Sequence, residues 1–329
     1  MHTVPRRTFL GGVGVAGMAM AIPGISSAQA PKIPKLGNKL KIVIPAVSRS
    51  SLDQTGRALG DAMVGLGITD EIEYDNLDGK GGTVGLMTFV DKHSADPNSF
   101  FMGDTTLVGS IAVQKPAATL ARVQPVARLI SDYLVVVVAA NSPIKTVNDL
   151  VQRLRTAPKQ TPIGIGTAGG VDHVFTGLLA KAAGGPLDDT TYLPFARSFE
   201  LVEAVMMGKV AVGITSYSVF AQDIAGGRLR ALGVSSAKAA YGVKSLREQG
   251  VDVDLTNWRA VFAGQAVPPA RRAEMAEALR VAMTYDFWKK TLKESNWEPS
   301  WLTGPNLSGF IDIEVKTIQL MVQLLKLKA

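Results

Sequence analysis

Short runs of β-branched and aromatic residues alternate with longer helical stretches from Lys39 to the end of the chain, and this alternation constrains the fold more than any other feature. It predicts an α/β protein with mainly parallel sheets. The most apolar run, residues 134–140, contains four consecutive valines and is typical of a strand buried on both faces. The predicted strands cover residues 40–45, 71–76, 99–103, 126–130, 133–139, 161–166, 190–195, 211–216, 231–235 and 258–263. The predicted helices cover residues 53–64, 83–90, 146–155, 172–183, 200–207, 269–283, 285–295 and 306–327.

The first thirty residues have the features of an export signal, so they are excluded from the fold prediction. Arg6 and Arg7 precede Thr-Phe-Leu and a Gly-rich, mildly apolar run over residues 11–22, as in twin-arginine signal peptides. The run is too short to span a membrane stably. Small residues favour cleavage after Ala28, and a cut after Ala30 is the alternative. We therefore expect a periplasmic protein, with a general secretion signal or a membrane anchor as the other interpretations.

Composition limits the class of the exported part. About 300 residues remain after cleavage, and an apolar content of 47% can fill the cores of two domains or of one large domain. The sequence has no cysteine, which excludes a thiolate metal site and a lipid anchor on an N-terminal cysteine. The formal charge of +7, about +5 without the leader, is spread among acidic residues, so no nucleic-acid partner is expected. No later segment is long enough to cross a bilayer, so the mature chain is not expected to be embedded in a membrane.

Two breaks in the pattern predict the domain organisation. Asn141-Ser142-Pro143 ends the valine strand, and Thr256-Asn257-Trp258 returns the chain from a second βα series. A chain that leaves one domain, builds a second and returns is arranged as a hinged clamp with a ligand in its cleft. The predicted first domain comprises residues 31–139 and 259–329, and the second comprises residues 140–258. A single doubly wound sheet is the alternative.

Three loops between predicted strands and helices are candidates for binding an anion. Residues 45–53 offer three serine hydroxyls and a guanidinium, residues 76–83 contain three glycines, and residues 164–173 join a strand to a helix. Ligands of open α/β sheets bind beyond the carboxyl ends of strands, where helix N-termini and backbone N–H groups attract negative charge. Aromatic residues make up only 6% of the chain, which favours a polar carboxylated solute over a sugar that needs stacking faces.

An exported enzyme that binds a dinucleotide is the main alternative function. Gly164, Gly166 and Gly169 match GxGxxG, but the next predicted strand, residues 190–195, carries no acidic residue for a ribose. Only His93 and His173 remain after cleavage, and there is no GxSxG or HExxH motif. We therefore expect no catalytic residue, no metal site and no cofactor.

Several stretches resemble the substrate-binding receptors of tripartite tricarboxylate transporters, also called the TctC or Bug family. The resemblance covers nearly the whole mature chain. The stretches that carry it are Asp53-Gln54-Thr55-Gly56-Arg57-Ala58-Leu59, Asp75-Asn76 with Gly79-x-Gly81-Gly82, Gly166-Thr167-Ala168-Gly169-Gly170-Val171-Asp172-His173, Pro194-Phe195 with Gly208-Lys209-Val210, and Ala225-Gly226-Gly227-Arg228-Leu229-Arg230-Ala231-Leu232.

The resemblance implies a two-domain type II periplasmic binding protein of the Venus-flytrap kind. Such a receptor closes around a small di- or tricarboxylate, citrate-like, and delivers it to the permease subunits of the transporter, without a cofactor or catalysis. The alternative role is that of a sensor, in which the closed, ligand-bound form is presented to a membrane signalling protein. The candidate ligand-binding residues, carried over by position, are Ser48, Arg49, Ser50, Ser51, Gly81, Gly82, Thr105, Thr167, Ala168, Gly169, Asp172, His173, Phe195, Ser198 and Ser216.

The first loop departs from the family pattern, in which glycines and an aromatic residue are usual where Arg49, Ser50, Ser51 and Leu52 stand. A second departure is Phe195-Ala196-Arg197-Ser198, where the family commonly has glycines. Either Arg49 forms a fork on a ligand carboxylate and changes the specificity, or it points to water.

Overall fold

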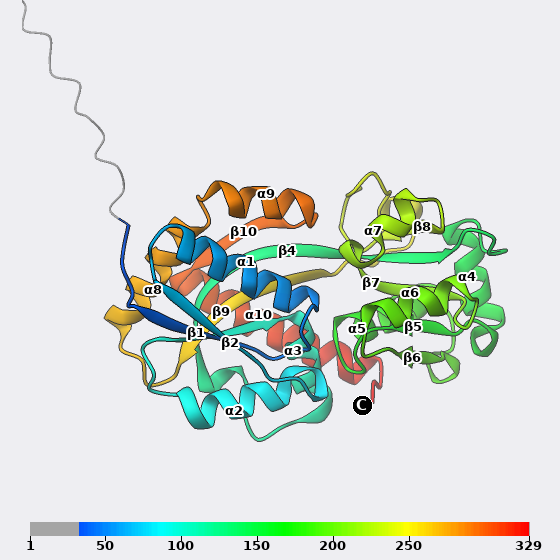
Figure 1. Cartoon of the computed structure of the whole chain (residues 1–329). Coiled ribbons are helices and arrows are strands. Elements are labelled where there is room, and N and C mark those ends of the chain that lie inside the picture. Colours follow the sequence, from blue (N-terminus) through cyan, green and yellow to red (C-terminus); the bar gives the residue numbers. More distant parts are fainter. Residues whose placement is uncertain (1–32, 329) are drawn as a thin grey trace, which may run out of the picture. The chain divides into compact units, whose positions relative to one another are not determined.

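The computed structural model describes residues 33–328, so the predicted leader and its cleavage sites lie outside the described residues. Strands and helices alternate along the described chain (Figure 1). The strands are β1 (Lys39–Ile44), β2 (Glu71–Asn76), β3 (Ser99–Asp104), β4 (Val123–Ala139), β5 (Ile163–Ile165), β6 (Tyr192–Pro194), β7 (Val212–Ser216), β8 (Leu229–Val234), β9 (Thr256–Gly264) and β10 (Glu298–Thr303). The helices are α1 (Ser51–Gly65), α2 (Thr83–His93), α3 (Thr105–Gln114), α4 (Val147–Thr156), α5 (Val171–Ala182), α6 (Ser198–Met206), α7 (Tyr217–Ala225), α8 (Pro269–Ala282), α9 (Asp286–Glu294) and α10 (Gly304–Leu324).

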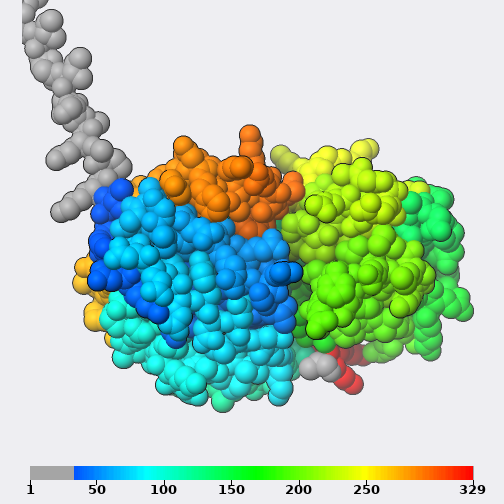
Figure 2. Space-filling model, in the orientation of Figure 1, coloured from blue at the N-terminus to red at the C-terminus, as the bar shows by residue number. Residues whose placement is uncertain are grey.

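The strands form one mixed sheet in the order β2-β1-β3-β9-β4-β7-β5-β6, with β8 and β10 also paired to β4. The long strand β4 joins the two halves of this sheet. Its first half pairs with β9 and β10, and its second half pairs with β7 and β8. Figure 2 shows the surface of the N-terminal segments, in blue, meeting the surface of the segments after β4, in green, along a seam.

Parallel pairing occurs only at the two outer parts of the described sheet. There β1 pairs in parallel with β2 and β3, and β5 pairs in parallel with β6 and β7. Every antiparallel pair of the described strands includes β4 or β9. The α/β class is confirmed, but the expected predominance of parallel pairing does not extend to the centre, because β4 and β9 carry the chain in opposite directions.

One strand replaces the two that were predicted over residues 126–130 and 133–139. The polar pair Ser131-Asp132 lies between the two predicted strands, and the observed strand continues through it. Both side chains are buried, and Asp132 forms an ion pair with Arg259 on β9. The buried charge within this strand is therefore neutralised by the neighbouring strand.

Two helices and one strand were missed. Helix α3 is rich in threonine, valine and isoleucine, which have low helix propensity, yet Asp104 caps its first turn by accepting from the backbone N–H of Leu107. Helix α7 and strand β10 also lie in stretches where no element was predicted. The other predicted elements agree with the structure to within a few residues at their ends.

The core lies on both faces of β4. Leu134, Val136 and Val138 pack into the largest hydrophobic cluster, whereas Val135 and Val137 point into another cluster beneath α6 and α7. All five side chains are buried. This explains the unbroken apolar run, because a strand covered on both faces needs apolar residues at every position.

Candidate functional site

A cavity of about 140 Å³ lies where the chain leaves the carboxyl ends of β1, β2, β3, β5, β6 and β7. This is the edge at which ligands of α/β sheets bind. All three of the predicted loops contribute to it, through residues such as Ser51, Gly81 and Thr167. The volume leaves room for a solute of roughly ten non-hydrogen atoms.

Five helices begin at this cavity, namely α1, α3, α5, α6 and α7, and the first turn or the N-cap of each lines it. Side chains cap two of them, because Ser50 accepts from the Asp53 N–H and Asp104 accepts from the Leu107 N–H. The N-caps of α5, α6 and α7 make no such bond. The first N–H groups of these three helices therefore remain available to an anion.

About half of the candidate residues from the sequence line the cavity. They come from segments before and after β4 in the sequence, and they include hydroxyl groups, backbone donors and one aromatic ring. Those at the cavity are Ser50, Ser51, Gly81, Thr167, Asp172, Phe195, Ser198 and Ser216.

Ser48 and Arg49 lie outside the main cavity, in the exposed part of the first loop. They line a separate hollow together with Arg197 and Phe199. Arg49 adopts a left-handed backbone conformation with φ of 67°, which is uncommon for a residue with a side chain. In this structure the guanidinium of Arg49 borders the rim rather than the space where a solute would lie.

The other five candidates are not part of the cavity lining. The buried hydroxyl of Thr105 accepts from the Trp258 N–H at 3.0 Å. Gly169 donates its N–H to Nδ1 of His173 at 3.0 Å, and burial lowers the pKa of His173 to about 4. His173 is therefore neutral at pH 7, and its ring nitrogen stabilises the loop that precedes it by accepting the Gly169 N–H. The remaining two, Gly82 and Ala168, are also absent from the lining.

The sequence reasoning missed five polar residues of the cavity: Asp78, Asp104, Thr106, Thr215 and Asn257. Asp104 and Thr106 directly follow a predicted buried strand, which is the signal that identified the other loops. Asn257 could not be found in this way, because it lies at the beginning of β9 and reaches the cavity only through the returning strand.

Gly81 allows the second loop to approach the third. Its φ is +61°, and an added Cβ would lie 2.0 Å from Oγ of Ser110 and 3.0 Å from Cγ2 of Thr167. A larger residue would therefore clash as well as strain the backbone. Close contact between these two loops depends on glycine at this position.

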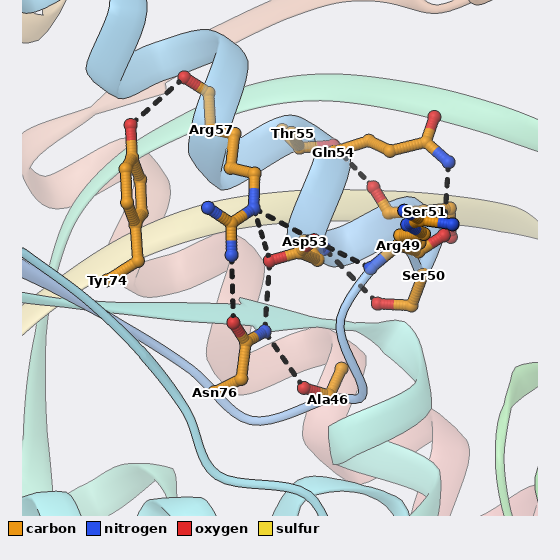
Figure 3. A network of polar contacts seen from close by, with 10 residues as sticks. All are labelled: Ala46, Arg49, Ser50, Ser51, Asp53, Gln54, Thr55, Arg57, Tyr74 and Asn76. Carbon is orange, nitrogen blue, oxygen red and sulfur yellow. Dashed lines mark hydrogen bonds and ion pairs between the residues drawn. The ribbon is translucent and has the colours of Figure 1, made fainter.

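A hydrogen-bond network around Asp53 fixes the first loop (Figure 3). The buried carboxylate accepts from the Arg49 N–H at 2.7 Å, from Nδ2 of Asn76 at 2.9 Å and from Nε of Arg57 at 3.0 Å. Nδ2 of Asn76 also donates to the Ala46 carbonyl at 3.1 Å. Burial alone would raise the pKa of Asp53, but these donors outweigh it and lower the pKa. The network ties the loops after β1 and β2 to one helix.

Comparison with known proteins identifies the family. Residues 66–327 match the model of the tripartite tricarboxylate transporter family receptor (TctC). The chain belongs to this family. The receptor is 22% identical to the "UPF0065 protein in gbd 5'region" of Cupriavidus necator, with 98% of both chains covered.

Solved structures share the fold of this receptor. Rpa4515 of Rhodopseudomonas palustris with adipate superimposes with a TM-score of 0.79 at 19% identity, covering 88% of this chain and 98% of that one. MatC of the same organism, with bound malate, gives 0.74 at 18% identity, covering 86% and 98%. The two-domain periplasmic binding protein fold expected from the sequence is thereby confirmed. The family is one of receptors rather than of enzymes.

The glycine loop of this receptor is poorly suited to a dinucleotide. The Gly166 N–H already donates to Oδ2 of Asp172 at 2.9 Å, and the Gly169 N–H donates to His173. A pyrophosphate needs such amides free. Gly164 serves packing instead, since an added Cβ would lie 2.5 Å from Leu201.

Acidic side chains gather at the inner end of the cavity. Burial raises the pKa of Asp104 to about 6 and that of Asp172 to about 7. Burial also raises the pKa of Asp132, which pairs with Arg259 behind the lining. No described residue of the lining is a lysine, arginine or histidine.

Within residues 33–328, no helix is both long enough and apolar enough to cross a membrane. The same residues contain no cluster of three or more histidine, aspartate or glutamate side chains that could hold a metal ion.

Proposed function

We propose that the chain is a periplasmic receptor that captures a small carboxylate in this cavity and presents it to the membrane subunits of a tripartite transporter. The observation that carries the proposal is the convergence of five helix N-termini on one cavity, three of them without a side-chain cap. Family membership supports the receptor role. Two relatives with the same fold have malate and adipate bound.

The energetics of such a site are adequate for a transport receptor. Each helix N-terminus attracts a carboxylate by about 0.3 to 2 kcal/mol. Hydrogen bonds to a charged group contribute about 1.5 to 3 kcal/mol each, so two or three of them with the helix termini approach the −8 kcal/mol of micromolar binding. Ser51, Thr167 and Ser198 supply hydroxyls beside these termini.

Binding would close the two domains around the solute. We keep the predicted division, with residues 31–139 and 259–329 in one domain and residues 140–258 in the other. Strands β4 and β9 are then the two places where the chain passes from one domain to the other. The lining includes Ser51 and Gly81 from the first domain and Thr167 and Ser198 from the second, so a bound solute favours the closed form.

The volume of the cavity limits the size of the solute. Room for roughly ten non-hydrogen atoms suits a linear acid of four to six carbons. Of the citrate-like di- or tricarboxylates that the sequence predicted, a linear dicarboxylate fits this room, whereas citrate itself exceeds it. Among the candidate residues, those that line the cavity are the proposed contacts, and Arg49 is not one of them.

A charge placed at the α6 N-terminus tests the carboxylate site. Ser198→Glu should leave the helix stable, because acidic residues suit the first turn, but it should repel a bound carboxylate. The matched control is Asn306→Glu, in the first turn of α10 and away from the cavity. Isothermal titration with small organic acids should show binding that is at least ten-fold weaker in the first variant and unchanged in the control. Equal affinities in the two variants would contradict the proposal.

A further inference from the structure

The charged side chains on the cavity wall all have the same sign. They are Asp78, Asp104 and Asp172, and the described lining has no basic residue. A dicarboxylate would bring a second negative charge to this wall. A solute with one carboxylate and one cationic group would instead be attracted at both of its ends.

A residue of the same lining carries a buried acceptor without a partner. Asn257 lines the cavity with 3% of its surface exposed, and its Oδ1 accepts no hydrogen bond within the described residues. Its Nδ2 is directed to Oγ of Ser216 at 3.5 Å. An unpaired buried carbonyl is costly, so a donor from the solute would stabilise it. Carboxylates offer no donor when ionised, whereas an ammonium group offers three.

The nearest buried cation does not offset these charges. Arg259 is fully buried and outside the cavity lining, where it binds Asp132, the Ser51 carbonyl and Oγ1 of Thr55. This one guanidinium acts on the carboxylates of both Asp132 and Asp104, whereas the charges that act on Asp172 are those of Asp132 and Asp104 themselves. When Asp104 and Asp172 are ionised, the inner end of the cavity carries negative charge that no described residue of the wall balances.

We infer that the solute is an amino carboxylate, whose ammonium group lies against Asp104, Asp172 and Asn257 while its carboxylate meets the uncapped N-termini of α6 and α7. This rests on the proposed function and narrows its solute class. The raised pKa values of Asp104 and Asp172 agree with it, because an ammonium group at this position would favour their ionised forms.

Calorimetric titration of the mature chain at pH 7.5 tests the inference. The panel contains amino carboxylates of three to six carbons, with the amine at the α or the terminal carbon, and the monocarboxylates and dicarboxylates of the same lengths. At least one amino carboxylate should bind ten-fold or more tightly than its dicarboxylate counterpart. Equal or tighter binding of the dicarboxylate overturns the inference and leaves the receptor proposal intact. If no carboxylate of the panel binds, the receptor proposal itself fails.

Isosteric variants separate charge recognition from a structural role. Asp104→Asn and Asp172→Asn keep an oxygen for the Leu107 and Gly166 N–H groups but remove the charge. Each should weaken amino carboxylate binding at least ten-fold and strengthen dicarboxylate binding. The control is Asp149→Asn, which changes the cap of α4 outside the cavity and should alter neither. An equal loss for both solute classes would mean that the carboxylates only shape the site, and would refute the inference.

The pH dependence supplies an independent readout. Between pH 5 and 8 the carboxyls of Asp104 and Asp172 ionise, beside Asp78, Asp132 and the constant charge of Arg259. Affinity for the amino carboxylate should rise over this range, and affinity for the dicarboxylate should fall. The opposite pair of slopes would indicate that protonated acids donate to a second carboxylate, and would overturn the inference.

Discussion

Replacing Arg259 by methionine should destabilise the receptor strongly. The guanidinium has no exposed surface, and it joins three parts of the chain by binding Asp132 on β4 and both Ser51 and Thr55 on α1. Its guanidinium carbon also lies 5.0 Å from the ring centre of Trp297. Methionine can fill much of the space but supplies none of these donors.

The magnitude follows from the carboxylate that is left behind. Asp132 is 2% exposed, and removing one partner of a buried ion pair costs about 3 to 5 kcal/mol because the other charge stays unpaired. With an unfolding entropy of about 2.1 cal/mol/K per residue, this corresponds to a fall in Tm of about 5 to 8 °C for this chain. Arg259→Met with Asp132→Asn leaves no unpaired charge, so it should recover at least half of the loss.

Urea denaturation followed by circular dichroism, with thermal unfolding in parallel, measures both effects. The control is Arg280→Met, since Arg280 is half exposed and pairs with Glu277, and this change should cost less than about 1 kcal/mol. A loss below about 1 kcal/mol for Arg259→Met would refute the reasoning. So would a double variant that is less stable than the single one, because the cost would then not come from the uncompensated carboxylate.

Three further predictions concern the rim, the acids and the leader. Arg49→Gly should raise the free energy of unfolding by about 0.5 to 1 kcal/mol, because glycine relieves the positive φ. Titration should find the solute affinity unchanged. A ten-fold loss of affinity would instead show that the Arg49 guanidinium binds a carboxylate of the solute. Burial raises the pKa of Asp172 above its unfolded value, so the folded state holds this proton and loses stability as pH rises from about 4 to 7. Asp172→Asn should therefore raise the Tm at pH 8 and change it little at pH 4, and a pH-independent effect would contradict this. Replacing Arg6 and Arg7 by lysine should keep the precursor in the cytoplasm of a bacterial host, as cell fractionation would detect, and undiminished export would favour the general secretion route.

The sequence predicted most accurately those elements whose position is determined by local features of the chain. Residues 71–76 match β2 without a shift, because alternation and flanking turn residues define the strand locally. Asp132 illustrates the opposite case. It lies between two predicted strands that are one strand in the structure, and its buried carboxylate is paired there with the distant Arg259. Pairing between residues far apart in sequence is not visible in a single-sequence pattern.

The same distinction applies to the candidate site. The loops that follow predicted strands were found because strand ends and glycine turns can be recognised locally. Which side chains of those loops enter the cavity depends on backbone conformation, as Arg49 with its positive φ and the inward-packed His173 demonstrate. Asn257 reaches the cavity from a strand that returns after the second domain, so no local signal could place it there.

The sharing of β4 between both halves of the sheet has a practical consequence for dissecting the molecule. Residues 134–139 pair with β7 and β8, so a fragment that starts at residue 140 would lack the strand on which those two assemble. It would expose unpaired edges and an open apolar face, and it should aggregate rather than fold. Independent expression of the distal half therefore requires the second half of β4, which a fragment that begins near Tyr133 would include.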